Sequence, residues 1–146
     1  MTIESQVRAA RLGAEPAVVC RLPSGWAALA HMQYLRGYSI LMPDPVVPSL
    51  NALNPAQRAA FLCDMALVGD ALMEVTGAYR INYAIMGNSD PVLHAHIVPR
   101  YLSEPDELRT GGPWSYSPEL VERMVFDPVA DHDLMQQLKA AIEKRL

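Results

Sequence analysis

The chain has 146 residues, with 12 Lys or Arg against 16 Asp or Glu, and a formal net charge of −4 at neutral pH. A chain of this length buries a core without metals or disulfides, so we expect one domain spanning 1–146. The acidic balance and the lack of any basic run argue against bulk nucleic-acid binding. No segment has the apolar length of a membrane span or of a signal peptide, so we expect no membrane partner and a cytoplasmic location.

The two cysteines give no sign of a disulfide framework or a zinc site. Cys20 and Cys63 lie in apolar runs and lack the CxxC or Cys/His spacing of a metal site. We therefore expect both to be reduced thiols in the core, and we expect no cofactor and no metal to be needed for folding.

The first part of the chain predicts a short helix and three strands. Apolar residues recur at helical spacing before Gly13, which offers a stop. Pro23-Ser24-Gly25 separates two apolar runs in the manner of a hairpin turn. These patterns predict a helix from residue 3 to Gly13, strands over 17–22, 26–30 and 38–42, and a proline-rich connector over 43–48.

The second part predicts a long helix, two strands and a closing helix. Asn54-Pro55 begins a helix well, with Asn as the cap and Pro in the first turn, and Gly77 ends it. Asp131 starts a last helix, which has Lys144-Arg145 at its end, as the helix dipole favours. Together these elements predict an α+β fold on an antiparallel sheet, with strands at 79–86 and 92–98 and a loop over 102–118.

The most informative run is Val92-Leu93-His94-Ala95-His96-Ile97-Val98-Pro99-Arg100. Residues two apart share a face of a strand, so His94 and His96 point to one side and Leu93, Ala95 and Ile97 to the other. Two neutral imidazoles side by side can hold a metal, transfer protons or attack an electrophile.

The residues alone leave three interpretations of this pair open. Each histidine could be a satisfied polar side chain on a half-exposed strand. A metal site would need further ligands, and Arg100 and Tyr101 stand where a carboxylate would be wanted. A nucleophile would need anion-binding donors, and the loop Gly87-Asn88-Ser89 just before the strand carries such groups.

These residues resemble the histidine-triad (HIT) superfamily. The segment from Asn88 to Arg100 has the family's alternation of His with apolar residues before Pro-Arg. The segment Arg36-Gly37-Tyr38-Ser39-Ile40-Leu41-Met42-Pro43 is similar to the family's strand that opens on Gly-His and runs to a proline. The resemblance implies a HIT-like fold of about five strands, one long crossover helix and a C-terminal helix, with 103–146 as an extension packing on or near the site.

The resemblance also assigns roles to single residues. The register set by Pro99-Arg100 makes His94 the counterpart of the middle histidine, the nucleophile that becomes nucleotidylated, and His96 that of the third histidine, near the scissile phosphate and its leaving group. Val92 stands where the first histidine of the triad belongs. We expect His94 and His96 to be catalytic, and we expect substrate contacts from Asn88, Ser89, Arg100, Tyr38, His31 and Trp114.

Two other positions depart from the family pattern. Tyr38 replaces the histidine that usually follows the strand-opening glycine, and Ala30 stands where many members have an Asn or Asp that contacts the ribose. These departures concern orienting and sugar-contacting groups more than the nucleophile.

The resemblance implies a nucleotide hydrolase or nucleotidyl transferase. It would act at the α-phosphate of a nucleoside phosphoramidate, a dinucleoside polyphosphate such as a diadenosine polyphosphate, or a similar nucleotide, through a nucleotidyl-histidine intermediate and without a cofactor. A catalytically weak nucleotide-binding module is the main alternative, and a metal-dependent hydrolase that uses the histidine pair is a further one. Small members of the superfamily commonly form homodimers, and an open sheet edge favours the same, so we expect a homodimer.

Overall fold

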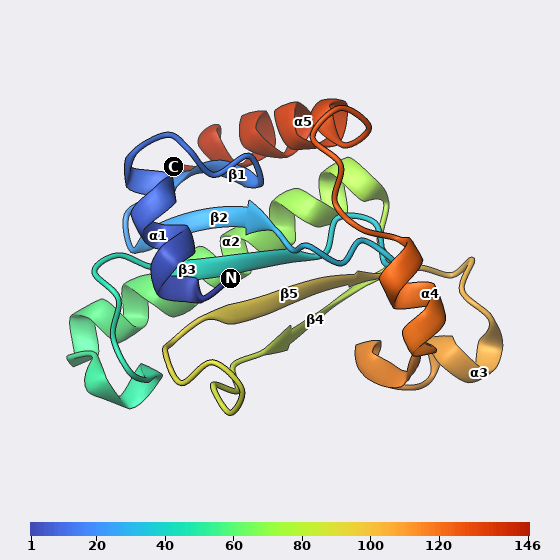
Figure 1. Cartoon of the computed structure of the whole chain (residues 1–146), viewed down its shortest axis with the longest axis horizontal. Helices are drawn as coiled ribbons and strands as arrows, with labels where there is room; N and C mark the ends of the chain where they lie inside the picture. The colour runs from blue at the N-terminus through green and yellow to red at the C-terminus, as the bar shows by residue number, and fades with distance from the viewer.

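The computed structural model describes all 146 residues and contains a five-stranded antiparallel sheet in the order β1-β2-β3-β5-β4 (Figure 1). The predicted α+β architecture is confirmed, with a long helix between the third and fourth strands. In chain order the elements are α1 (Ile3–Arg11), β1 (Val18–Leu22), β2 (Gly25–Leu29), β3 (Ser39–Pro43), η1 (Leu50–Ala52), α2 (Pro55–Thr76), β4 (Arg80–Ala84), β5 (Ala95–Arg100), α3 (Asp106–Arg109), η2 (Pro113–Ser115), α4 (Pro118–Arg123) and α5 (His132–Glu143).

The β1–β2 hairpin turns where the sequence predicts it and is tied to the long helix. The main-chain N–H and the hydroxyl of Ser24 donate to the Asp64 carboxylate of α2, at 2.9 and 2.6 Å. Gly25 opens β2 because a side chain has no room there, since a Cβ would lie 1.9 Å from the carbonyl oxygen of Met42.

The long helix α2 begins and ends at the predicted residues. The Asn54 side chain accepts from the N–H of Gln57, whose own side chain accepts from the N–H of Asn54, at 2.8 and 3.0 Å. This capping box satisfies two of the donors that a helix start leaves unpaired. Gly77 ends the helix in the left-handed conformation, with φ of 71°. None of the helices combines the length with the apolar character that a membrane span requires.

The sheet separates two apolar clusters. One face packs against α2 and α5 and includes Leu93, Ala95 and Ile97, as the alternation predicts. The opposite face packs against α1, which crosses in front of the sheet while α2 runs behind it (Figure 1). Ile40 and Val98 lie on this second face, and His96 shares it because its register partner in β3 is Ile40.

The structure differs from the prediction around the fifth strand. We expected a strand over 92–98, whereas β5 begins at Ala95. Residues before it leave the ladder because the N–H of Leu93 donates to the carbonyl of Val47, in the connector, at 2.8 Å. The expected loop over 102–118 contains the short helices α3 and η2, and α4 begins at its end. These one-turn helices are too short to show a period in the sequence.

The two cysteines have different environments. Cys20 is buried in the core, and burial raises the pKa of its thiol to about 11. Cys63 is exposed, so the expectation that it lies in the core is wrong. The apolar run that suggested a core position continues around α2 onto the face that points to solvent.

Candidate active site

The two histidines lie side by side on the α1 face of the sheet. Their ring centroids are 5.0 Å apart, with the ring planes inclined by 67°. His94 directly precedes β5 and is 9% exposed, whereas His96 lies within β5 and is partly exposed. His96 is flanked in the sheet by Ile40 of β3 and Ala84 of β4. The alternation in the sequence therefore brings both rings to one place.

The main chain orients the His94 ring. Its Nδ1 atom lies 2.9 Å from the carbonyl oxygen of Val92. A carbonyl oxygen accepts but cannot donate, so the neutral ring carries its proton on Nδ1. The other nitrogen, Nε2, then holds a free lone pair, which is the form that a nucleophilic or basic imidazole needs.

The His96 ring contacts two aromatic side chains. The hydroxyl of Tyr38 lies 2.8 Å from its Nδ1 atom, and the indole N–H of Trp114 donates to the same hydroxyl at 3.3 Å. The Trp114 and His96 rings meet edge to face, with centroids 5.4 Å apart. Trp114 comes from η2, so the segment after β5 reaches back to the histidines.

Burial keeps His96 neutral. Desolvation, and after it the neighbouring His94, lower the pKa of its imidazole to about 4. Burial raises the pKa of Tyr38, whose side chain is 0% exposed. Both groups are therefore uncharged around neutral pH, so they can exchange hydrogen bonds but bring no charge to the site.

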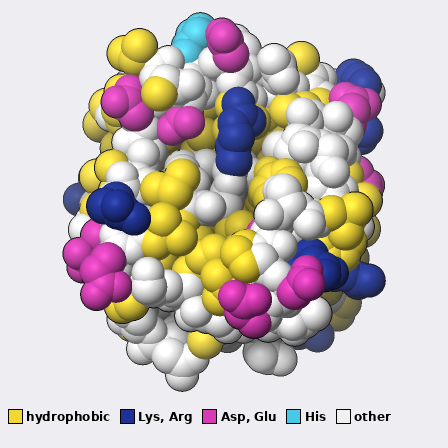
Figure 2. Space-filling model, turned by 90° about the vertical axis from the view of Figure 1, so that its right-hand side faces the viewer, with side chains coloured by type: hydrophobic (Ala, Val, Ile, Leu, Met, Phe, Trp, Pro, Cys, Tyr) yellow, Lys and Arg dark blue, Asp and Glu magenta, His cyan; other side chains and the backbone are white.

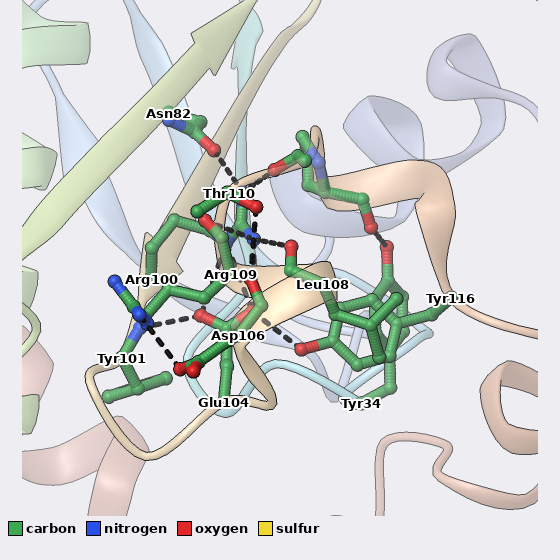
Figure 3. Close-up of polar contacts among 12 residues, drawn as sticks. Tyr34, Asn82, Arg100, Tyr101, Glu104, Asp106, Leu108, Arg109, Thr110 and Tyr116 are labelled. Atoms are coloured by element: carbon green, nitrogen blue, oxygen red, sulfur yellow. Dashed lines mark hydrogen bonds and ion pairs between the residues drawn. The ribbon is translucent and has the colours of Figure 1, made fainter.

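Arg100 forms a buried ion pair and several hydrogen bonds within the protein. Its side chain is 3% exposed and pairs with the Glu104 carboxylate at 3.0 Å. It also donates to the side chain of Asn82 and to the main-chain oxygens of Leu108 and Gly111, each at 2.8 Å (Figure 3). Because every guanidinium nitrogen has a protein acceptor, we correct the expectation and leave Arg100 out of the substrate contacts.

Glu104 completes this buried network. Burial acts to raise the pKa of its carboxyl group, but hydrogen bonds from Arg100, Tyr116 and the N–H of Tyr101 outweigh it and hold the pKa below its usual value. The Tyr116 hydroxyl donates to the carboxylate at 2.5 Å. The network fixes the path of the chain after β5, and Trp114 lies on that path.

Asn88, Ser89 and His31 are exposed. Their side chains form no hydrogen bond with the protein, so their polar groups are open to a ligand. The loop that carries Asn88 and Ser89 is anchored at Asp90, whose carboxylate accepts from the N–H of Ile3 at 2.7 Å. The start of α1 therefore fixes the loop before the histidines, and the sequence carried no signal of this contact.

Sequence reasoning also missed Gln33. Its buried amide donates to the carbonyl oxygens of Ala30 and Tyr38, at 2.9 and 2.8 Å, and accepts from the N–H of Gly37 at 2.9 Å. It thus fixes the loop between β2 and β3 and places Tyr38 under His96. A single Gln in an irregular segment gives no periodic signal, so only the tertiary contacts identify it.

The structure contains no group of three or more His, Cys, Asp or Glu side chains placed to hold a metal ion. A cavity of about 370 Å³ lies beside the Arg100 network, and neither histidine lines it. Figure 2 shows this end of the molecule, where apolar side chains gather around a hollow with charged side chains about it. The lining consists of Tyr34, Leu35, Arg36, Thr76, Tyr101, Ser103, Glu104 and Tyr116.

No protein-family model and no curated protein sequence matches the chain. Solved structures do match it. A histidine triad protein from Marinobacter aquaeolei is 21% identical, with a TM-score of 0.73 over 92% of this chain and 94% of that one. A hypothetical histidine triad nucleotide-binding protein from Sulfolobus tokodaii is 17% identical, with a TM-score of 0.73 over 96% and 92%.

A zinc-bound histidine triad family protein from Mycobacterium smegmatis is 20% identical, with a TM-score of 0.67 over 99% of each chain. These similarities extend over nearly the whole length of both chains in each comparison. The chain therefore has the histidine-triad fold that its two sequence segments predict.

Proposed function

We propose that the protein is a nucleotide hydrolase or nucleotidyl transferase of the histidine-triad type. It acts at the α-phosphate of a nucleoside phosphoramidate, a dinucleoside polyphosphate or a related nucleotide. The observation that carries the proposal is the His94 ring, whose Nδ1 proton is bound by the Val92 carbonyl so that its Nε2 lone pair is free beside His96.

The proposed reaction has two displacements at phosphorus. The Nε2 atom of His94 attacks the α-phosphorus, an N–P bond forms, and the bond to the leaving group breaks with its electron pair going to the leaving group, which takes up a proton from the solvent where it departs as an amine. Water then attacks the phosphorus and releases one proton to the solvent, an O–P bond forms, and the N–P bond breaks with its pair returning to Nε2. In a transferase another acceptor replaces water. The Val92 carbonyl holds the Nδ1–H of His94 throughout and stabilises the positive charge on the ring of the intermediate.

The remaining groups stabilise charge on the phosphoryl oxygens, which is where such reactions gain most of their rate. His96 is the nearest donor to His94. We assign further donors to the exposed loop that holds Asn88 and Ser89, and base or sugar contacts to His31 and Trp114, whose side chain is 47% exposed. Tyr38 contacts His96 and not the substrate.

Trapping of the covalent intermediate tests the proposal. The intact protein is mixed with a panel of nucleoside phosphoramidates and dinucleoside polyphosphates, quenched in milliseconds and weighed by mass spectrometry. We expect the wild type to gain one nucleotidyl group and His94→Asn to gain none. His132→Asn is the matched control because His132 is exposed at the start of α5. Turnover by His94→Asn at the wild-type rate would overturn the proposal.

The same panel separates the enzyme from a binding module. Titration calorimetry with AMP and GMP measures binding without chemistry. Tight binding of AMP or GMP, together with no turnover and no mass gain for any panel member, would show that the protein is a nucleotide-binding module and not an enzyme. A rate that falls with chelator and returns with added metal would instead favour the metal-dependent alternative.

We also propose that the protein forms a homodimer through α2 and the edge strand β4. The outward face of α2 is largely apolar: it exposes Ala59, Cys63, Ala66 and Met73, with the charged Asp70 and Glu74 toward its C-terminal end. Tyr83 of the adjacent edge strand is 42% exposed beside this face. A helix with this composition is stable in water when its second face is also covered, and a second copy supplies a matching apolar surface next to a matching open edge.

A further inference from the structure

We propose that Trp114 and Tyr38 act as a positioning relay that holds His96 in the tautomer with its proton on Nε2. His94 and His96 would then present opposite groups to the same ligand, a lone pair and an N–H donor. The catalytic consequence rests on the proposed function, whereas the tautomer is a property of the free protein and can be measured without any substrate.

The direction of the hydrogen bonds follows from what each group can donate. An indole N–H donates only, so Trp114 gives its proton to the Tyr38 oxygen at 3.3 Å. The hydroxyl has one proton of its own and one other partner, the Nδ1 atom of His96 at 2.8 Å. The Tyr38 O–H therefore donates to Nδ1, which must be unprotonated to accept it.

The opposite tautomer fails for the same reason. If Nδ1 of His96 carried the proton, both Trp114 and His96 would donate to the Tyr38 oxygen, and the hydroxyl proton of Tyr38 would have no acceptor. Tyr38 is fully buried and its hydroxyl has no third partner, so solvent cannot replace the missing acceptor. The protein therefore favours the Nε2–H form of His96.

This arrangement matches the needs of a phosphoryl-transfer site. The Nε2 atom of a ring whose Nδ1 faces Tyr38 points away from that hydroxyl, and His96 lies beside the nucleophile. An N–H donor at this point would bind a phosphoryl oxygen as negative charge develops, whereas a second lone pair would repel it. Tyr38 thus takes over an orienting role at the position where the family usually has a histidine.

Trp114 links the relay to the segment after β5. The neighbouring Pro113 is held by the hydroxyl of Tyr34, which donates to its carbonyl at 2.7 Å. Displacement of η2 would remove the indole donor from Tyr38 and release the constraint on His96. The relay thereby makes the presented N–H donor depend on the position that η2 takes in this structure.

Nitrogen-15 NMR of the imidazole rings tests the proposal directly. Long-range proton–nitrogen correlation in the full-length protein at pH 7 assigns the tautomer of each ring. We expect His96 to be more than nine-tenths Nε2–H in the wild type. Tyr38→Phe should yield a measurable Nδ1–H fraction, and Trp114→Phe a smaller one. Tyr83→Phe is the control, because it removes a tyrosine hydroxyl on the opposite face of the sheet, where Tyr83 pairs with Ile97 and its hydroxyl lies at Gly69 of α2.

Three results would overturn the relay: a wild-type His96 with its proton on Nδ1, a Tyr38→Phe spectrum with the wild-type tautomer ratio, or an equal change in Tyr83→Phe. Kinetics give a second reading, since Tyr38→Phe should lower kcat about tenfold and leave KM within about threefold. Trapping by His94 tests the proposed function separately. If no nucleotidylated His94 is trapped but the NMR spectra show the expected tautomers, the relay is supported and only its proposed role in catalysis is contradicted.

Discussion

The Nδ1 atom of His94 lies 2.9 Å from the main-chain oxygen of Val92, at the position where the family usually has the first histidine of the triad. The contact uses a carbonyl group, which every residue has, so the departure in side chain leaves the orientation of His94 intact. The N–H of Val92 is in turn held by the carbonyl of Asp90 at 2.8 Å, which fixes the direction of the peptide.

Replacing Val92 should therefore have little effect on chemistry. We expect Val92→Ala to retain kcat within about threefold, because the carbonyl contact survives. The loss of a partly buried methyl pair should lower the free energy of unfolding by about 1 kcal/mol. Steady-state kinetics and urea denaturation measure the two effects. A loss of activity as large as that of His94→Asn would show that the Val92 side chain has a direct role.

Acid should destabilise the fold partly through His96. Its pKa is lowered from 6.5 to about 4 in the folded protein, so between these pH values the unfolded chain binds a proton that the folded one does not. The stabilising contribution is thus full above pH 6.5 and is lost as the pH falls to 4. We expect a loss of about 2 kcal/mol, less than the full linkage value because the ring is partly open to solvent.

Urea denaturation at a series of pH values checks this prediction. His96→Asn removes the titrating ring, so its stability should decline less steeply than that of the wild type between pH 6.5 and 4. The carboxylates titrate in both proteins and cancel in the difference. Parallel curves for the two proteins would contradict the low pKa of His96.

The Arg100–Glu104 pair should be among the most sensitive points of the fold. Its side chains are 3% and 5% exposed, so Glu104→Gln leaves a buried guanidinium without its counter-charge. We expect a loss of about 3–5 kcal/mol. The exposed pair of Arg109 with Asp106, whose carboxylate side chain is 91% exposed, provides the control, and Asp106→Asn should lower the stability far less than Glu104→Gln. Equal losses in the two variants would show that burial does not govern this pair.

A charge on the outward face of α2 should prevent dimerisation. We expect Ala66→Glu to sediment as a monomer of 16.1 kDa, while the wild type sediments at twice that mass. Gln136→Glu places the same charge on the exposed face of α5 and should leave the dimer intact. A wild-type protein that sediments only as a monomer would remove the proposed interface.

The sequence predicts most of the architecture because local signals mark its elements. The capping pair around Asn54 and the stop at Gly77 give the limits of α2, and Pro23-Ser24-Gly25 marks the hairpin turn. The assignment of Cys63 to the core was wrong because an apolar helix that is covered on one face looks the same in sequence as one covered on both. The limits of β5 were missed because a strand ends where its partner stops pairing, which depends on a distant segment.

The sequence by itself determined that His94 and His96 share a face, because the period of a strand is two residues and both lie within one short run. Only the tertiary structure decided what surrounds them. Tyr38 and Trp114 come from segments 58 residues before His96 and 18 after it, and no local pattern relates their positions to His96. For the same reason the sequence predicted a substrate contact for Arg100, whereas the structure shows it in a buried ion pair. Hydrogen-bond partners far apart in the chain are chosen by the packing of the whole fold.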